Sequence, residues 1–227
     1  MPWNYHMSFQ SFIYQALDKY EPEIATKLHQ YPHAPPFSFS EFIQTGPFQA
    51  TDDGLMCESG YWIVTSDDKR IIDAVANHAQ HDSKLTLGHT TIPVTGVDIE
   101  KIQGKEKERY KSTSPIYVSQ RGEDGEVEDL FPEDGMWYSR LKDSVRDRIR
   151  HERTLPDDFQ FIIDEVHWSK KKRLRSGDGW RSCSRLELTI RSDLETSEFI
   201  QQQGLGEKTG MGFGNLMPTN EIPEEWR

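Results

Sequence analysis

Five glycines fall within eleven residues near the C-terminus, from Gly204 to Gly214. Glycine adopts positive φ at little cost, and a run of glycines bares backbone N–H groups that suit an anion. The dinucleotide fingerprint needs a glycine where Thr209 stands, and no register of the stretch gives the P-loop sequence. Residues 197–203 have the pattern of a helix end, and residues 213–217 that of a short strand. The glycines therefore join a helix to a final strand, which points away from the mononucleotide-binding folds.

The composition describes an acidic chain with enough apolar residues for a core. Its 227 residues carry a formal net charge of -11, and 34% are hydrophobic. An acidic chain does not attract a polyanion as a whole, so a nucleic-acid function requires a local basic surface. The two cysteines, Cys57 and Cys183, make no disulfide framework, no Cys/His group has zinc spacing, and we expect no metal and no cofactor. The lack of a long apolar run predicts a cytoplasmic protein without a signal peptide or membrane span.

The second half of the chain has the element order of a ferredoxin-like domain. Helices are predicted over residues 133–152, with Trp137 and Leu141 on the apolar face, and over residues 193–203. The predicted strands are residues 116–118, 159–168, 185–190 and 213–217. The resulting order, β-α-β-β-α-β, places two helices on one face of a four-stranded antiparallel sheet.

The first half has the same order without its first strand. Apolar residues at helical spacing from Phe9 predict a helix, and Pro22 begins a second helix that ends near Leu28. A third helix is predicted to be capped by Asp67. The predicted strands are residues 37–40 and 61–65, followed by a β-rich segment over residues 85–97. The charged run 104–111 is predicted to join two domains, residues 1–108 and 109–227.

Both ends of the chain resemble one known family. The glycine-rich stretch 204–214 resembles the signature of the CRISPR-associated repeat-RNA endoribonucleases of the RAMP superfamily. The N-terminal pattern of that family is matched by Asn4-Tyr5, Phe12-Ile13-Tyr14, Leu28-His29 and Phe37-Ser38-Phe39-Ser40. The resemblance implies an α+β fold of two tandem ferredoxin-like, RRM-like domains. It also implies metal-independent cleavage of precursor CRISPR RNA, in which the 2′-hydroxyl attacks the phosphate and leaves 2′,3′-cyclic phosphate and 5′-hydroxyl ends.

The resemblance also implies the catalytic residues. The family's tyrosine falls at Tyr14 and its histidine at His29, whereas its lysine position holds Pro35, for which Lys27 and His33 are nearby substitutes. Histidine titrates near neutral pH and suits acid or base catalysis, whereas tyrosine is the better hydrogen-bond donor. Without the family match, His29 would be interpreted as a surface residue, and Tyr14 remains equally compatible with a packed core role. The family's first strand has no counterpart before Asn4.

The strongest basic cluster in this acidic chain is the run 170–175, and Trp180 follows it closely. Positive side chains gather phosphates, and a β-hairpin can enter the groove of an RNA stem, although such a run can also be a solvated hairpin tip. The glycine stretch can hold an RNA strand or simply make a tight connection. The predicted RNA-binding residues are Lys170, Lys171, Lys172, Arg173, Arg175, Arg181, Gly204, Gly206, Lys208, Gly210, Gly212 and Gly214.

Two functions stay open on the sequence. The first is an endoribonuclease whose partner is CRISPR repeat RNA, both as precursor and as mature product. The second is a non-catalytic repeat-RNA-binding RAMP subunit of a CRISPR effector complex, because the expected lysine is replaced by Pro35. Contact with effector subunits and a homodimer are further partner hypotheses.

Overall fold

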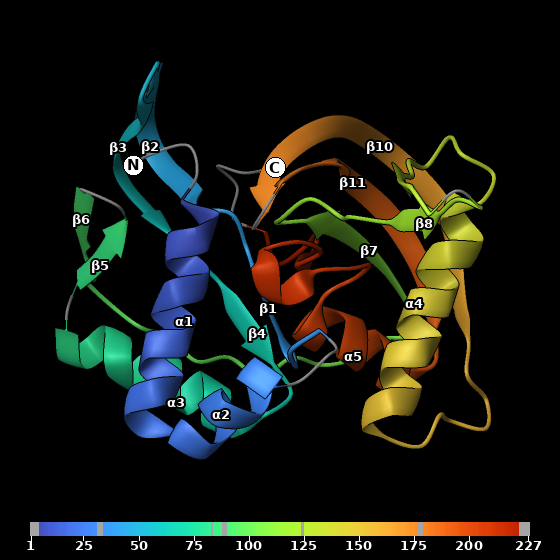
Figure 1. Ribbon diagram of the computed structural model, residues 1–227, viewed down its shortest axis with the longest axis horizontal. Coiled ribbons are helices and arrows are strands. Elements are labelled where there is room, and N and C mark those ends of the chain that lie inside the picture. The colour runs from blue at the N-terminus through green and yellow to red at the C-terminus, as the bar shows by residue number, and fades with distance from the viewer. Residues whose placement is uncertain are drawn as a thin grey trace.

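Figure 1 shows a computed structural model of the chain, with the N-terminal domain in blue to green and the C-terminal domain in green to red. It describes residues 5–30, 34–82, 84–87, 90–123, 125–176 and 179–222. Two earlier predictions concern residues outside these ranges: the absence of a first strand before Asn4, and His33 as a substitute for the lysine. Within the described part of the chain, no helix has the length and apolar character needed to cross a bilayer.

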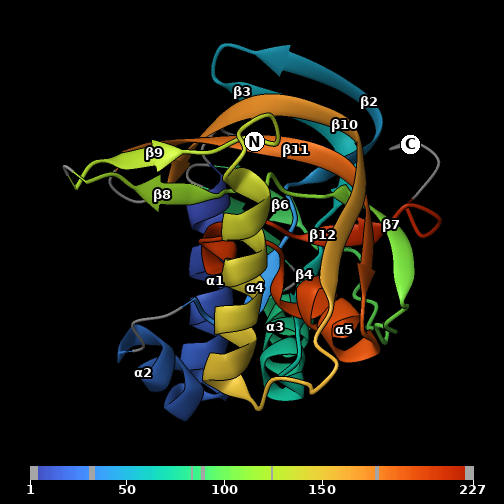
Figure 2. The same ribbon diagram turned by 90° about the vertical axis from the view of Figure 1, so that its right-hand side faces the viewer.

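The C-terminal domain is built on one antiparallel sheet with the strand order β10-β11-β7-β12. Its strands are β7 (Lys107–Ser112), β10 (Phe161–Ser176), β11 (Gly179–Ser192) and β12 (Leu216–Pro218). The two helices are α4 (Trp137–Glu152) and α5 (Leu194–Gln203), and Figure 2 shows β10 and β11 curving past them. With β7 as the first strand, this is the predicted β-α-β-β-α-β order.

The predicted first strand of this domain is wrong, and β10 and β11 extend further toward each other than predicted, so the basic run 170–175 lies within a strand. Ile116 forms only an isolated bridge to Ser184, so the first strand is β7 and not residues 116–118. The predicted boundary between residues 108 and 109 falls inside β7, and we propose a boundary before Lys107. The acidic segment after Val118 forms a small hairpin of β8 (Ser119–Arg121) and β9 (Val127–Asp129).

Helix α4 covers the core of this domain with the predicted apolar stripe. Trp137, Leu141, Val145 and Ile149 are fully buried against Leu186, Leu188 and Ile190 of β11. Helix α5 begins at Asp193, whose carboxylate accepts the backbone N–H of Thr196 at 2.8 Å and so caps the first turn.

The N-terminal domain packs its helices around a second apolar core. Its elements, in chain order, are α1 (His6–Tyr20), α2 (Pro22–Gln30), β1 (Phe37–Phe39), β2 (Ile43–Thr51), β3 (Gly54–Tyr61), β4 (Val64–Ser66), α3 (Lys69–Asp82), β5 (Lys84–Leu87) and β6 (Thr90–Pro93). The strands pair as β1-β4, β2-β3 and β5-β6, and the β2-β3 hairpin projects from the domain (Figure 1). The predicted strand 61–65 is divided between β3 and β4, and Asp68 instead of Asp67 accepts the backbone N–H of Arg70 at the start of α3.

Asn215, just before β12, joins the two domains. Its side-chain amide donates to Ser38 Oγ at 2.7 Å and to Thr65 Oγ1 at 2.9 Å in the N-terminal domain. Its backbone carbonyl accepts the N–H of Thr113 at 2.8 Å in the C-terminal domain. All four residues are buried, so these hydrogen bonds fix the position of one domain on the other.

Candidate active site and nucleic-acid interface

Tyr14 of α1 and His29 of α2 lie in contact, as the two predicted catalytic residues must. Their rings stack with centroids 4.9 Å apart and planes 28° apart, and the edge of Phe37 supports Tyr14 from 6.2 Å. His29 is exposed, whereas Tyr14 is half-buried, and this burial raises the pKa of the Tyr14 phenol. The phenol therefore stays protonated at neutral pH and acts as a hydrogen-bond donor beside a solvent-facing imidazole.

The two substitutes for the missing lysine have different outcomes. Lys27 is exposed on α2 two residues before His29, a spacing that turns the two side chains to different faces of the helix. His33 lies outside the described residues. Pro35 packs against the glycine stretch so closely that a Cβ on Gly210 would clash with its ring. Pro35 therefore contributes packing where the family pattern has a cation.

A groove of about 450 Å³ separates Ala34 from α4. Its opposite wall carries Arg140, Asp143, Ser144, Asp147, Arg148, His151 and Glu152 of α4, together with Glu207. Sequence reasoning missed this surface because the arginines of α4 have acidic neighbours at helical spacing, and Arg146 is indeed paired with Asp143 at 2.8 Å. Ala34 lies three residues before Phe37, whose ring packs on Tyr14, but neither Tyr14 nor His29 lines this groove.

The glycine-rich stretch is packed between the two domains. Its five glycines are buried, and Gly204, Gly206, Gly212 and Gly214 have φ between 73° and 89°. The Arg148 guanidinium donates to the carbonyls of Gln203, at 2.7 Å, and Gly204, at 3.0 Å, and burial lowers the pKa of Arg148 to about 10. Close packing and positive φ therefore explain why glycine occupies these positions. Contact of the five glycines and Lys208 with RNA stays a prediction.

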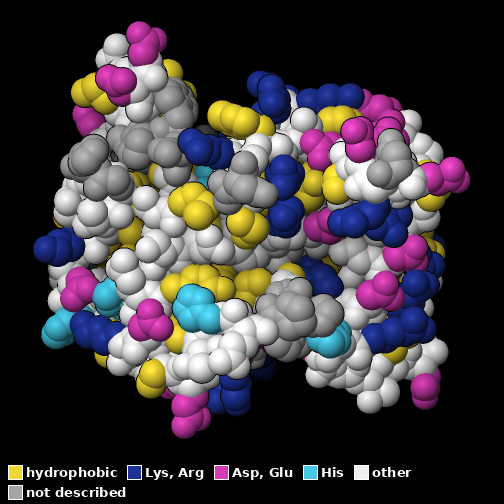
Figure 3. Space-filling view, in the orientation of Figure 1, with side chains coloured by type: hydrophobic (Ala, Val, Ile, Leu, Met, Phe, Trp, Pro, Cys, Tyr) yellow, Lys and Arg dark blue, Asp and Glu magenta, His cyan; other side chains and the backbone are white. Residues whose placement is uncertain are grey.

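The predicted basic cluster lies on the β10–β11 hairpin and is divided between its two faces. The register pairs Lys170 with Arg185 and Lys172 with Cys183, whereas Arg175 pairs with Trp180 on the opposite face. Lys171 and Arg173 share that opposite face, where the Arg173 guanidinium lies 5.7 Å from the ring of Trp180. Figure 3 shows Lys and Arg side chains gathered over β10, with acidic side chains beside them. The cluster is thus a two-sided basic surface that ends in an exposed aromatic ring.

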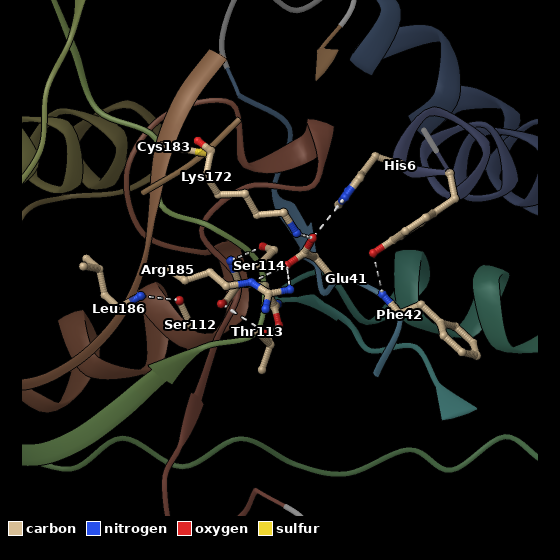
Figure 4. Close-up of polar contacts among 12 residues, drawn as sticks. His6, Glu41, Phe42, Ser112, Thr113, Ser114, Lys172, Cys183, Arg185 and Leu186 are labelled. Carbon is tan, nitrogen blue, oxygen red and sulfur yellow. Dashed lines mark hydrogen bonds and ion pairs between the residues drawn. The ribbon is translucent and has the colours of Figure 1, made fainter. Parts of the chain in front are cut away.

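Two of the predicted RNA-binding lysines are ion-paired. Lys171 Nζ lies 2.6 Å from the exposed carboxylate of Glu133. Lys172 is paired with Glu41, which follows β1 and is only 1% exposed (Figure 4). Of the predicted hairpin cations outside these two pairs, Lys170, Arg173 and Arg175 are exposed.

Glu41 is the centre of an ion cluster that the sequence reasoning missed. Its carboxylate also binds Arg185, whose Nε lies 2.8 Å away, and His6 Nε2 lies 3.5 Å away (Figure 4). Burial alone would raise the pKa of Glu41, but the contacts with His6, Lys172 and Arg185 outweigh it and hold that pKa well below its usual range. The available signal was a carboxylate inside the apolar run Phe37 to Ile43, where an unpaired charge is costly.

The family model described as CRISPR associated protein Cas6, C-terminal, matches residues 99–217, more than half of the chain. The chain belongs to the Cas6 family. The CRISPR-associated endoribonuclease Cas6 1 of Methanocaldococcus jannaschii is 26% identical over 222 residues, which cover 96% of this chain and 87% of that Cas6 protein.

Solved structures of Cas6 relatives agree with the fold. One, described as the characterization of a Cas6-related gene from Pyrococcus furiosus, has a TM-score of 0.83 at 24% identity and covers 98% of this chain and 93% of that one. Another, described as a RAMP protein binding different RNA substrates, has a TM-score of 0.80 at 25% identity and covers 96% and 92%. The predicted family and its fold of two ferredoxin-like domains are therefore confirmed.

Proposed function

We propose that this Cas6 chain is an endoribonuclease that cleaves precursor CRISPR RNA within the repeats without a metal ion. The observation that carries the proposal is the contact between Tyr14 and His29, in a chain of this family. The Methanocaldococcus relative is named a CRISPR-associated endoribonuclease, and the second structural neighbour is described as binding RNA, which supports the substrate class.

The chemistry requires one proton to leave the 2′-hydroxyl and one to reach the 5′ oxygen. The 2′ oxygen forms a bond to phosphorus, the bond from phosphorus to the 5′ oxygen breaks, and the products carry a 2′,3′-cyclic phosphate and a 5′-hydroxyl. His29 is exposed, and an imidazole nitrogen can either accept or donate a proton, so it can serve either transfer. Tyr14 orients the imidazole by stacking and offers its hydroxyl to a phosphate oxygen.

The RNA is held, in this proposal, by the basic hairpin and the glycine-rich stretch. Lys170, Arg173 and Arg175 bind phosphates, and the exposed ring of Trp180 stacks on a base.

Cleavage of the cognate repeat RNA in EDTA tests the reaction. We expect cleavage at one position in the repeat at an unchanged rate, with a 2′,3′-cyclic phosphate on the upstream product. Product ends are identified by acid or phosphatase treatment followed by gel electrophoresis. Loss of activity in EDTA that added Mg²⁺ restores, or a 3′-hydroxyl end, would overturn the proposed chemistry.

Replacing Tyr14 by phenylalanine tests the role of its hydroxyl. The variant keeps both ring contacts, with His29 and with Phe37, so we expect an unchanged thermal midpoint. The loss of one hydrogen bond to the transition state, worth about 1 kcal/mol, should lower the single-turnover rate by about fivefold. A wild-type rate would assign Tyr14 to packing alone.

The alternative function is that of a non-catalytic repeat-RNA-binding RAMP subunit, and Pro35 at the family's lysine position favours it. This alternative predicts tight, salt-sensitive binding of the repeat RNA without cleavage at any pH. Turnover of the repeat RNA would reject it.

A further inference from the structure

The Glu41 cluster brings two cations of the C-terminal domain onto one anion of the N-terminal domain. Lys172 belongs to β10 and Arg185 to β11, and both bind the carboxylate of Glu41. The Glu41 side chain is 1% exposed, whereas those of Lys172 and Arg185 are 32% and 34% exposed. The carboxylate of Glu41 is therefore buried, whereas about a third of each cationic side chain is exposed to solvent.

The hydrogen-bonding capacity of the cluster is not exhausted by Glu41. An ammonium group carries three N–H donors and a guanidinium five, whereas a carboxylate offers about four lone-pair sites. Glu41 engages the Nε and Nη2 atoms of Arg185, which form one edge of the guanidinium. Two formal positive charges thus meet one negative charge, and the cluster keeps donors and net positive charge for another anion.

The register of the hairpin places a third cation beside this cluster. Lys170 is the direct cross-strand partner of Arg185, and Lys172 lies two residues further along the same face. Lys170 is exposed. A phosphate at this position would meet three cations, of which the carboxylate of Glu41 holds two in place.

We propose that Glu41 is a positioning residue that holds Lys172 and Arg185 as a phosphate site for RNA at the junction of the two domains. The inference rests on the proposed function, since the phosphate belongs to the repeat RNA. Charge-assisted hydrogen bonds to a buried carboxylate fix the cations before the RNA arrives, which lowers the entropy cost of binding. The site is complete only when both domains are docked, because its anchor and its cations come from different domains.

The test measures RNA binding as a function of salt with two probes. One is the repeat RNA with a 2′-deoxy substitution at the cleavage position, which cannot be cut, and the other is a single-stranded oligouridylate. Arg185→Gln and Lys172→Gln should each weaken binding several-fold and lower the slope of log Kd against log salt by about one. Glu41→Gln should weaken binding of both probes, because the cations remain but are no longer held.

A double-mutant cycle separates positioning from a merely structural role. Glu41→Gln should weaken binding much less in the Lys172→Gln/Arg185→Gln background than in the wild type, since Glu41 acts through those two side chains. Asp164→Asn is the matched control: it removes a β10 carboxylate paired with Lys107 at 3.0 Å and Arg191 at 2.9 Å, which have no part in the proposed site, and it should keep the wild-type affinity.

Each outcome decides between the two proposals. Tighter binding by Glu41→Gln would mean that Glu41 withholds the cations from RNA, and equal losses in both backgrounds would mean a structural role; either result overturns the inference. Arg185→Gln leaves the Glu41–Lys172 pair intact, so an unchanged affinity and slope in that variant would also overturn it even if Glu41→Gln failed to fold. Oligouridylate binding that depends on both cations, in a protein that does not cleave the repeat, would support the inference and reject the proposed activity.

Discussion

Replacing His29 by alanine is expected to lower the single-turnover rate of repeat-RNA cleavage by about 10² to 10⁴-fold, the usual contribution of one general acid or base. The affinity for the RNA should stay within about threefold of wild type, because His29 moves a proton and is not part of the basic hairpin. His29 is exposed at the end of α2, so its removal leaves no cavity, and the lost stacking on Tyr14 should lower the thermal midpoint by only about 2 to 4 °C. Single-turnover kinetics with excess protein report the chemical step separately from product release.

His81→Ala provides the control for this experiment. His81 is also an exposed histidine in the last turn of a helix, α3, and we propose no part for it in the reaction. It should keep the wild-type rate. Wild-type activity in His29→Ala would move the catalytic role to another residue, and His151, which lines the groove opposite Ala34, would be the next to test.

Replacing Gly214 by alanine is expected to destabilise the folded protein by at least about 2 kcal/mol in the absence of RNA. Gly214 has a φ of 73°, and a Cβ there would clash with the backbone carbonyl of Leu205. The Gly214 carbonyl already accepts the N–H of Leu205 at 2.7 Å, so the two segments cannot separate without losing a buried hydrogen bond. Urea denaturation gives the free energy of unfolding directly.

Gly96→Ala is the matched control for the same measurement. A Cβ at Gly96 would meet no atom within 4 Å, and its φ lies outside the left-handed region. We expect its stability to stay within about 0.5 kcal/mol of wild type or to rise slightly. A stable Gly214→Ala variant with weakened RNA binding would instead indicate that this glycine serves RNA contact and not packing.

Much of the fold was predictable because its periodic signals are strong. The apolar stripe of α4 and the spacing from Phe9 in α1 gave two helices correctly, and the order of elements gave the C-terminal sheet. Strand β7 was missed because only Tyr110 and Ser112 are buried in a strand that otherwise reads as charged. Its charged side chains form ion pairs with a neighbouring strand, as Arg109 does with Glu187 of β11 at 2.5 Å. A local sequence pattern does not reveal such a pair.

The candidate site was predictable only where its residues lie close together in the sequence. The Tyr14–His29 contact followed from a family pattern confined to two consecutive helices. The Glu41 cluster joins residues 131 and 144 positions apart, so neither partner has a local signal for the other. The glycine stretch was recognised correctly as a family signature, but its burial between the domains depends on Pro35 and Phe39 from the other end of the chain.

The hydrogen bond from Asn215 to Ser38 spans 177 residues, and it has a consequence for synthesis on the ribosome. Ser38 and Thr65 are made well before Asn215, a buried partner of both, which follows them by 177 and 150 residues. Until then the emerging N-terminal domain carries buried hydroxyl groups without that partner and an uncovered face on β1, both of which cost stability. Contacts of such long sequence separation also slow folding. Folding of the N-terminal domain is therefore completed only after Asn215 has emerged, and until then the nascent chain is exposed to chaperones and proteases.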